Sequence, residues 1–229
     1  MGFAALLLLL AGAWASNGDR QEYFAECRER CLNVHNCAVA PISVLTFTCT
    51  QECNYECMWS QEQLLRAQTP PLPRHQYFGK WPFIRLFGIQ EPVSVFFSLL
   101  NAYAHVRALV WERQRFAPAH LPQTLQWACL VNAWVAIAAW LGSALFHYRD
   151  TWFTERLDYH LAVGHMAMQL WFAIARSFHD SPRVLVAAGV GIATWFTRHV
   201  WYLNAVHFDY GYNMQATTLT PCGIFAPFH

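Results

Sequence analysis

A hydroxyl, an imidazole and a carboxylate occur close together where an apolar run of the sequence gives way to a polar stretch. Ser143 and His147 are four residues apart, so on a helix they lie on one face, about one turn from each other. Asp158 follows a short polar loop, at the start of the next apolar run. Polar and ionisable groups at a membrane edge are costly and are usually functional there. The three residues are therefore candidates for a hydrolytic site.

Two kinds of hydrolytic site use these residue types. In the first, His147 binds zinc, and the metal-bound water becomes nucleophilic near neutral pH. Asp158 then orients a ligand or accepts a proton from the water, and Ser143 contacts a ligand or stabilises the developing oxyanion. In the second, Ser143 is the nucleophile, His147 its base and Asp158 the orienting group. The helical spacing of Ser143 and His147 favours the metal site, although one histidine alone does not hold zinc.

Ser143 and His147 also have structural interpretations. A serine near a helix end often bonds a backbone carbonyl, and an interfacial histidine often only anchors its polar tip at the headgroups. His160 and His165 could replace missing ligands, but on a helix their spacing points them in different directions, so we expect them to bond between helices.

The composition places the site in a membrane protein. Of the 229 residues, 55% are hydrophobic and 13% are charged, whereas soluble domains carry roughly a quarter charged residues. The net charge of +1 gives no reason to expect a nucleic-acid partner. Four apolar runs, each near the ~20 residues that cross a bilayer, lie between residues 93 and 212 at about 93–111, 125–147, 159–176 and 184–203. We therefore predict an all-α polytopic membrane protein with about four transmembrane helices.

Loop charges predict the orientation of these helices. The loop after the first run contains three arginines and one acid, and Arg176 and Arg183 lie between the third and fourth runs, so both loops should be cytoplasmic. The loop 149–158 balances two arginines against three acids and should be lumenal. The candidate site then faces the lumen. Asp209, in a second polar and aromatic patch, is expected to cap a following helix rather than bind a headgroup.

The first 81 residues predict a secreted, disulfide-stapled module. Residues 1–15 resemble a signal peptide, because their apolar core is too short to span a bilayer and small residues precede a cleavage site; an uncleaved anchor helix is the alternative. Residues 16–81 form a lumenal module with six cysteines: Cys27, Cys31, Cys37, Cys49, Cys53 and Cys57. In an oxidising lumen these cysteines favour disulfides over a zinc site. Six cysteines allow 15 pairings, and the sequence does not choose among them.

Residues 82–92 link this module to the apolar runs. Trp81, Phe83 and Phe87 suit a stretch that lies at headgroup level, where aromatic side chains are enriched. Pro92 can open the first spanning helix, because its missing N–H is not needed at a helix start.

A series of short motifs resembles the family of post-GPI attachment to proteins factor 3. These are YECMW at 55–59, GKWPF at 79–83, QEP at 90–92, FH at 146–147, RDT at 149–151, DY at 158–159 and FDYGYN at 208–213. The resemblance implies a seven-helix, lumen-facing lipid hydrolase of the Golgi membrane, or alternatively of the endoplasmic reticulum. It implies a phospholipase A2 type of activity that removes the sn-2 fatty acid from GPI phosphatidylinositol, with GPI-anchored proteins and their lipid as substrates.

The wider superfamily, with alkaline ceramidases and adiponectin receptors, implies zinc and a pattern of Ser-x-x-x-His, a later Asp and a C-terminal His-x-x-x-His. Ser143 and His147 match the first motif and Asp158 the aspartate, which makes His147 a metal ligand and the other two catalytic residues. No His-x-x-x-His occurs, and residues 213–229 differ from the family. We therefore expect a C-terminally truncated, inactive form. A non-catalytic lipid-binding or receptor-like protein and a ceramidase-like amidase are the alternatives.

Overall fold

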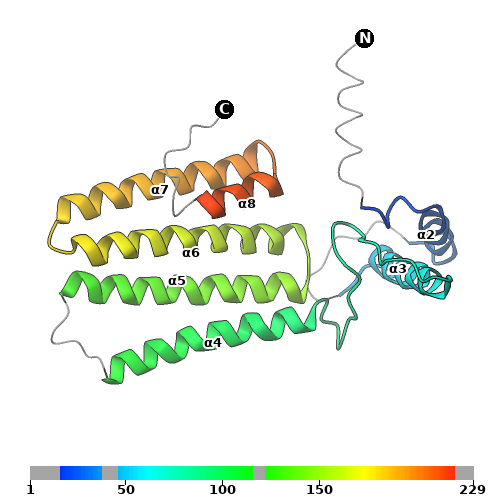
Figure 1. Cartoon of the computed structure of the whole chain (residues 1–229), viewed down its shortest axis with the longest axis horizontal. Helices are drawn as coiled ribbons and strands as arrows, with labels where there is room; N and C mark the ends of the chain where they lie inside the picture. Colours follow the sequence, from blue (N-terminus) through cyan, green and yellow to red (C-terminus); the bar gives the residue numbers. More distant parts are fainter. Residues whose placement is uncertain (1–15, 38–45, 116–121, 220–229) are drawn as a thin grey trace, which may run out of the picture. The chain divides into compact units, whose positions relative to one another are not determined.

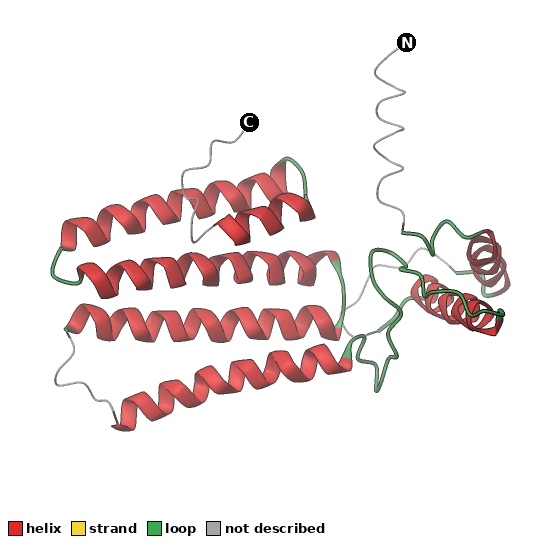
Figure 2. Cartoon of the chain, viewed as in Figure 1, coloured by secondary structure: helices red, strands yellow, loops and turns green. Residues whose placement is uncertain are grey.

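The structure is a computed structural model that describes residues 16–37, 46–115 and 122–219. The predicted signal peptide and the last ten residues of the predicted tail lie outside the described residues. Within the described ranges the chain forms seven helices and no strand, as the all-α prediction required (Figure 2). The chain divides into two compact units, Met1–Gly88 and Ile89–His229.

The N-terminal unit is built on two helices, α2 (Glu22–Val34) and α3 (Cys49–Ala67). Helix α3 begins with a capping box, in which the Thr48 side chain and the Gln51 side chain each bond the other residue's backbone N–H. The disulfides pair Cys27 with Cys57, Cys31 with Cys53 and Cys37 with Cys49. Moving one turn forward on α2 therefore means moving one turn back on α3, so the two helices are antiparallel.

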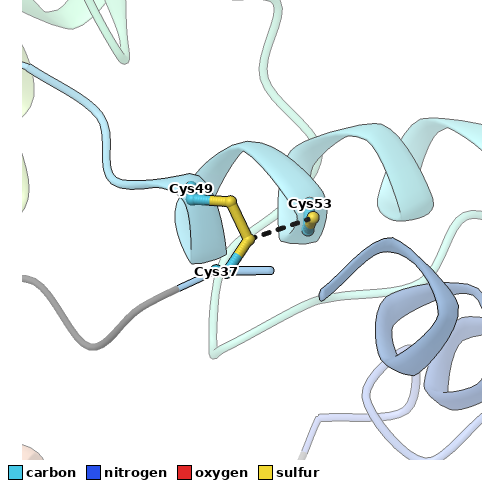
Figure 3. A group of neighbouring side chains, drawn as sticks. All are labelled: Cys37, Cys49 and Cys53. Carbon is cyan, nitrogen blue, oxygen red and sulfur yellow. Dashed lines mark hydrogen bonds between the residues drawn. A yellow bond between two sulfur atoms is a disulfide. The ribbon is translucent and has the colours of Figure 1, made fainter. Parts of the chain in front are cut away.

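These pairings confirm the disulfide prediction and answer the zinc alternative for this module. The sulfur atoms of Cys37, Cys49 and Cys53 lie within 4.8 Å of one another, which is close enough for a metal. Figure 3 shows why they do not hold one: Cys37 is bonded to Cys49, and Cys53 lies beside them at 4.0 Å from the Cys37 sulfur. Cys53 is itself bonded to Cys31. Metal-binding cysteines must be thiolates, and disulfide sulfurs are not.

A small core completes this unit. Phe24, Cys57 and Tyr77 are buried together, and the Glu62 carboxylate lies beneath them, nearly inaccessible to solvent. Glu62 accepts hydrogen bonds from the Tyr77 hydroxyl at 3.1 Å and from the His75 backbone N–H at 3.0 Å. Burial, and then the charge of Glu62, raise the pKa of Tyr77. A core of this size stabilises a domain only weakly, so the disulfides carry much of the unit's stability.

Two tight turns expose aromatic side chains at the end of this unit. Phe78 and Phe87 have φ of 50° and 52°, and the glycine after each also has positive φ, as left-handed turns require. The Phe87 side chain is 98% exposed and that of Trp81 is 54% exposed, whereas Phe83 is half-buried. The prediction that this stretch lies at headgroup level therefore rests on two strongly exposed aromatic residues rather than three.

The C-terminal unit is a row of long helices. They are α4 (Pro92–Arg115), α5 (Gln123–Tyr148), α6 (Trp152–Phe178) and α7 (Pro182–Ala205), followed by the short α8 (Tyr210–Leu219). Each long helix packs against the next in the chain, and α8 lies against α6 (Figure 1). Because the connections are short, neighbouring helices run antiparallel. One end of the row therefore gathers the start of α4, the end of α5 and the start of α6.

Three of these helices are long and apolar enough to cross a membrane: α4 over Pro92–Trp111, α5 and α7. They make the chain a multi-pass membrane protein. Helix α6 has sufficient length at 27 residues but carries Glu155, Arg156, Asp158 and Arg176 along it. It lies between α5 and α7, where polar groups are tolerated better than at a lipid-facing surface. The fourth predicted span therefore stays a prediction.

Helices α5 and α6 approach closely at Gly142, and we predict that a large side chain there separates them. A Cβ at Gly142 would lie 2.6 Å from Leu161 Cδ1, whereas a Cβ at Gly191 would meet nothing within 4 Å. We expect Gly142→Leu to destabilise the protein by about 1–3 kcal/mol through overpacking. The matched control Gly191→Leu should be neutral or stabilising by up to about 1 kcal/mol, because glycine disfavours helix. Thermal unfolding in detergent measures both; equal effects would contradict the close packing.

Candidate active site at the ends of α5 and α6

The face of α5 that carries Ser143 and His147 is turned toward α4. The Ser98 hydroxyl of α4 donates to Ser143 Oγ at 3.3 Å, and Ser98 is itself buried. Helix α5 ends one residue after His147, at Tyr148. The predicted spacing of the serine and histidine on one helical face is therefore present, and the neighbouring helix supplies a second hydroxyl.

The carboxylate that contacts His147 is Glu91. Its Oε2 lies 2.8 Å from His147 Nδ1, and the Glu91 side chain is 7% exposed. An ionised carboxylate can only accept, so Nδ1 donates the proton of this hydrogen bond and Nε2 keeps a lone pair. The sequence analysis missed this residue. The signal available was a carboxylate placed directly before the proline that opens a predicted spanning helix.

The segment before α4 is clamped onto the end of α5. The backbone N–H of Gln90 donates to the Tyr148 carbonyl at 3.0 Å, and that of Glu91 donates to the His147 carbonyl at 3.0 Å. The Gln90 side chain accepts from the backbone N–H of Asp150 at 3.0 Å. The last carbonyls of a helix have no partner within it, so these bonds satisfy groups that would otherwise need water. The two backbone bonds also bring the Glu91 carboxylate to His147.

Glu91 and His147 lie at opposite kinds of helix end. The Glu91 carbonyl accepts the first bond of α4, from the Val95 backbone N–H, and Pro92 follows as the first helical residue. Glu91 thus sits at the positive end of one helix dipole, while His147 lies in the last turn of α5, at the negative end of another. The start of a helix stabilises a carboxylate, so this position suits an ionised Glu91 side chain.

Asp158 reaches the same end of the unit from α6. A capping box at Thr151 and Thr154 starts this helix, and the Thr154 hydroxyl also donates to the Arg149 carbonyl at 2.6 Å. With a rise of about 1.5 Å per residue, Asp158 lies about 9 Å below the start of α6, and Ser143 lies about 8 Å from the end of α5. The two residues are therefore at similar depth on adjacent antiparallel helices. The structure joins Glu91, not Asp158, to Nδ1 of His147.

The second polar and aromatic patch packs beside Asp158. The Phe208 ring stacks on Tyr159 with 5.3 Å between centroids and 4° between planes. The Arg156 guanidinium lies 4.2 Å over Trp152 and 4.4 Å over Phe208. The motif at 208–213 predicted a group of aromatic residues. Its packing against Tyr159 and Arg156 of α6 is seen only in the tertiary structure.

The expected helix cap at Asp209 is confirmed. Its carboxylate accepts from the Tyr212 backbone N–H at 3.0 Å, and its carbonyl accepts from that of Asn213 at 3.0 Å. Helix α8 therefore continues past the predicted boundary at residue 213. Asn213 then bonds the fully buried His199 at 3.2 Å, which holds α8 on α7.

The other histidines have partners away from His147. His160 Nε2 lies 2.8 Å from the Asn204 amide on α7, which confirms the expected bond between helices. His165 instead pairs with Gln169 on its own helix at 3.1 Å, because residues four apart lie on one helical face. The expectation of an interhelical bond was wrong for His165.

The described residues do not complete a zinc site around His147. Metal ions are held by groups of His, Cys, Asp or Glu side chains whose ligand atoms lie close together. Among the described residues, Cys37, Cys49 and Cys53 are the one such group. A hydrolytic zinc site uses three protein ligands and one open position. His147 offers one ligand atom, Nε2, so the predicted metal does not fit these residues alone.

Comparison with known proteins tests the resemblance. A model of the Per1-like family matches residues 40–225. The mouse protein named GPI-specific phospholipase A2-like PGAP3 is 38% identical over 92% of this chain and 68% of its own length. Its human counterpart is 35% identical over 94% of this chain and 70% of its own length. The protein named post-GPI attachment to proteins factor 3 in Drosophila melanogaster is 31% identical, over 95% and 71% respectively. No solved structure matches this chain. The chain belongs to the Per1-like family, together with the post-GPI attachment factors that its motifs predicted.

Proposed function

We propose that this protein acts in GPI-anchor lipid remodelling and hydrolyses the sn-2 fatty acid ester of GPI phosphatidylinositol. The relatives' names support the remodelling role and a phospholipase A2-like chemistry. The observation that carries the proposal is the His147 imidazole, held by Glu91 at 2.8 Å and four residues from Ser143. The loop charges favour the lumenal side for this end of the row. As its location we propose the Golgi membrane or, alternatively, the endoplasmic reticulum.

The proposed reaction is the attack of water on the sn-2 ester. Nε2 of His147 takes a proton from the water while the water oxygen bonds the ester carbon. Glu91 then stabilises the resulting imidazolium. The Ser143 hydroxyl donates to the developing oxyanion. The ester C–O bond then breaks, the imidazolium returns the proton to the departing glycerol oxygen, and a fatty acid and a lysolipid leave.

Asp158 has a supporting place in this proposal. It lies at the depth of Ser143 on the adjacent helix, where a carboxylate can orient the attacking water or accept its proton. We also propose zinc as the cofactor, with His147 as one ligand; a bound zinc ion lowers the pKa of its water. Metal binding and proton transfer use the same lone pair of Nε2, so for His147 they are alternatives.

The test is complementation. The chain is expressed in cells that lack GPI sn-2 deacylation, and the acyl chains on GPI-anchored proteins are analysed by mass spectrometry. The missing His-x-x-x-His predicted an inactive form, whereas the Glu91–His147 pair favours activity, so we expect loss of unsaturated sn-2 chains. Unchanged chains, with the protein present at normal levels in the membrane, would refute the activity of this chain.

A second candidate is a lipid-binding or receptor-like role without catalysis. The specific observation in its favour is that the described residues converge on no complete ligand set around His147. Metal analysis of the purified protein separates the two: stoichiometric zinc would argue against a pure binding role. A ceramidase-like amidase uses the same site chemistry, and release of fatty acid from a ceramide but not from a GPI lipid would identify it.

A further inference from the structure

The segment Gln90–Glu91 contacts α5 in two separable ways. Its backbone N–H groups and the Gln90 side chain bond the end of the helix, and these bonds need no charge. The Glu91 carboxylate alone reaches an imidazole, at His147 Nδ1. The first set of contacts already joins the start of α4 to the end of α5. The buried carboxylate therefore calls for a role of its own, because burying a charge without a partner is costly.

We infer that Glu91 is a positioning residue that fixes the tautomer and direction of the His147 ring, so that Nε2 is the nitrogen presented for chemistry. This inference rests on the proposed function for its consequence but not for its geometry. The pair resembles the arrangement in which a catalytic or metal-binding histidine donates its other ring N–H to a carboxylate. It differs from the sequence expectation, in which Asp158 was the orienting group.

The surroundings of Glu91 support an ionised acceptor at this position. The start of α4 supplies the positive end of a helix dipole, and the Ser94 hydroxyl lies 3.5 Å from Oε2 on the next turn. The Glu91 residue is 6% exposed, so water competes little for the carboxylate. The Phe146 ring lies beside that of His147, with 5.3 Å between centroids. The imidazole thus has one donor contact and a restricted orientation.

The first test reads the tautomer directly. The whole protein is labelled with ¹⁵N-histidine in detergent or nanodiscs, and the His147 signal is assigned by its loss in His147→Asn. We expect a protonated Nδ1 and an unprotonated Nε2 in the wild type at neutral pH. Glu91→Gln should keep this tautomer, because its amide oxygen still accepts, whereas Glu91→Ala should give a mixture. A wild-type His147 with its proton on Nε2 would overturn the inference.

The second test separates positioning from structural support. Gln90→Ala removes a bond at the end of α5 but leaves the carboxylate in place, so it is the matched control. We expect Glu91→Ala to lower the deacylation rate about 10- to 100-fold, as loss of such a partner does elsewhere. Gln90→Ala should change the rate by less than about threefold and leave the His147 tautomer unchanged. If both variants lowered the rate equally and both gave a mixture of His147 tautomers, Glu91 would have only a structural role, and the inference would be overturned.

The two proposals fail in different ways. If the wild type shows no deacylation while His147 carries its proton on Nδ1 and Glu91→Ala disturbs it, the positioning role stands and the proposed reaction falls. If deacylation is present and Glu91→Ala retains the full rate and a single Nδ1 tautomer, the reaction stands and the positioning role falls.

Discussion

Replacing His147 with asparagine should abolish GPI sn-2 deacylation and leave the protein folded. The Asn side-chain amide can still donate to Glu91, as Nδ1 of His147 does at 2.8 Å, so no buried carboxylate is left without a donor. The variant lacks any atom at the position of Nε2. We expect the rate to fall about 10²- to 10⁴-fold, as for loss of a general base. Mass spectrometry of acyl chains on GPI-anchored proteins, in deficient cells, measures the loss.

Two companion variants complete this experiment. His147→Ala should lose the same activity and additionally destabilise the protein by about 1–3 kcal/mol, because Glu91 then lacks its buried partner. His179→Ala is the control at the opposite end of α6, where the ring contacts Asp180 at 3.2 Å and no site residue is near. Its activity should match the wild type. Full deacylation by His147→Asn would remove His147 from both the proton-transfer and the metal-ligand roles.

Removing one disulfide at a time should destabilise the N-terminal unit in the order of the loops that the disulfides close. The paired cysteines are separated by 30, 22 and 12 residues for Cys27–Cys57, Cys31–Cys53 and Cys37–Cys49. Applied to each loop taken by itself, the chain-entropy relation gives losses of about 3.6, 3.4 and 2.8 kcal/mol. Cys57 and Cys53 are also buried, so replacing either with alanine adds a small cavity.

The measurement is pulse proteolysis of the whole protein in detergent across a urea series. We expect double alanine variants of the first two pairs to be largely unfolded in this unit at 37 °C, because small disulfide-dependent domains often do not fold without one bridge. Cys129→Ala is the control, since this residue forms no disulfide in the described part of the chain. Its effect should stay below about 1 kcal/mol. A reversed order among the three pairs would contradict the loop-closure explanation.

The sequence was sufficient for features that depend on neighbours along the chain. The spacing of Ser143 and His147 predicts one helical face, since α-helix geometry is local. The position of Asp209 before an aromatic run predicts a helix cap, which the Tyr212 bond confirms. The apolar runs predict the spanning helices, and α4, α5 and α7 are long and apolar enough to cross a membrane, whereas α6 is more polar.

Other features required the tertiary structure because they join distant parts of the chain. Six cysteines in an oxidising lumen predict disulfides, but the pairing depends on α2 and α3 being antiparallel. His160 bonds Asn204 on α7, 44 residues away in the sequence. Nothing local in either motif distinguishes these outcomes.

The candidate site also combines features that the sequence predicts with features that only the tertiary structure shows. The types and spacing of Ser143, His147 and Asp158 determined where chemistry could occur, because each residue lies within two turns of the helix end that meets the polar loop. The partner of His147 is 56 residues away in sequence, and only the docking of the α4 start onto the α5 end brings Glu91 to it. Helix propensity and apolar periodicity determine where each helix forms. The contact of Gln90 and Glu91 with α5 instead arises because carbonyls at a helix end need hydrogen-bond donors from elsewhere in the chain.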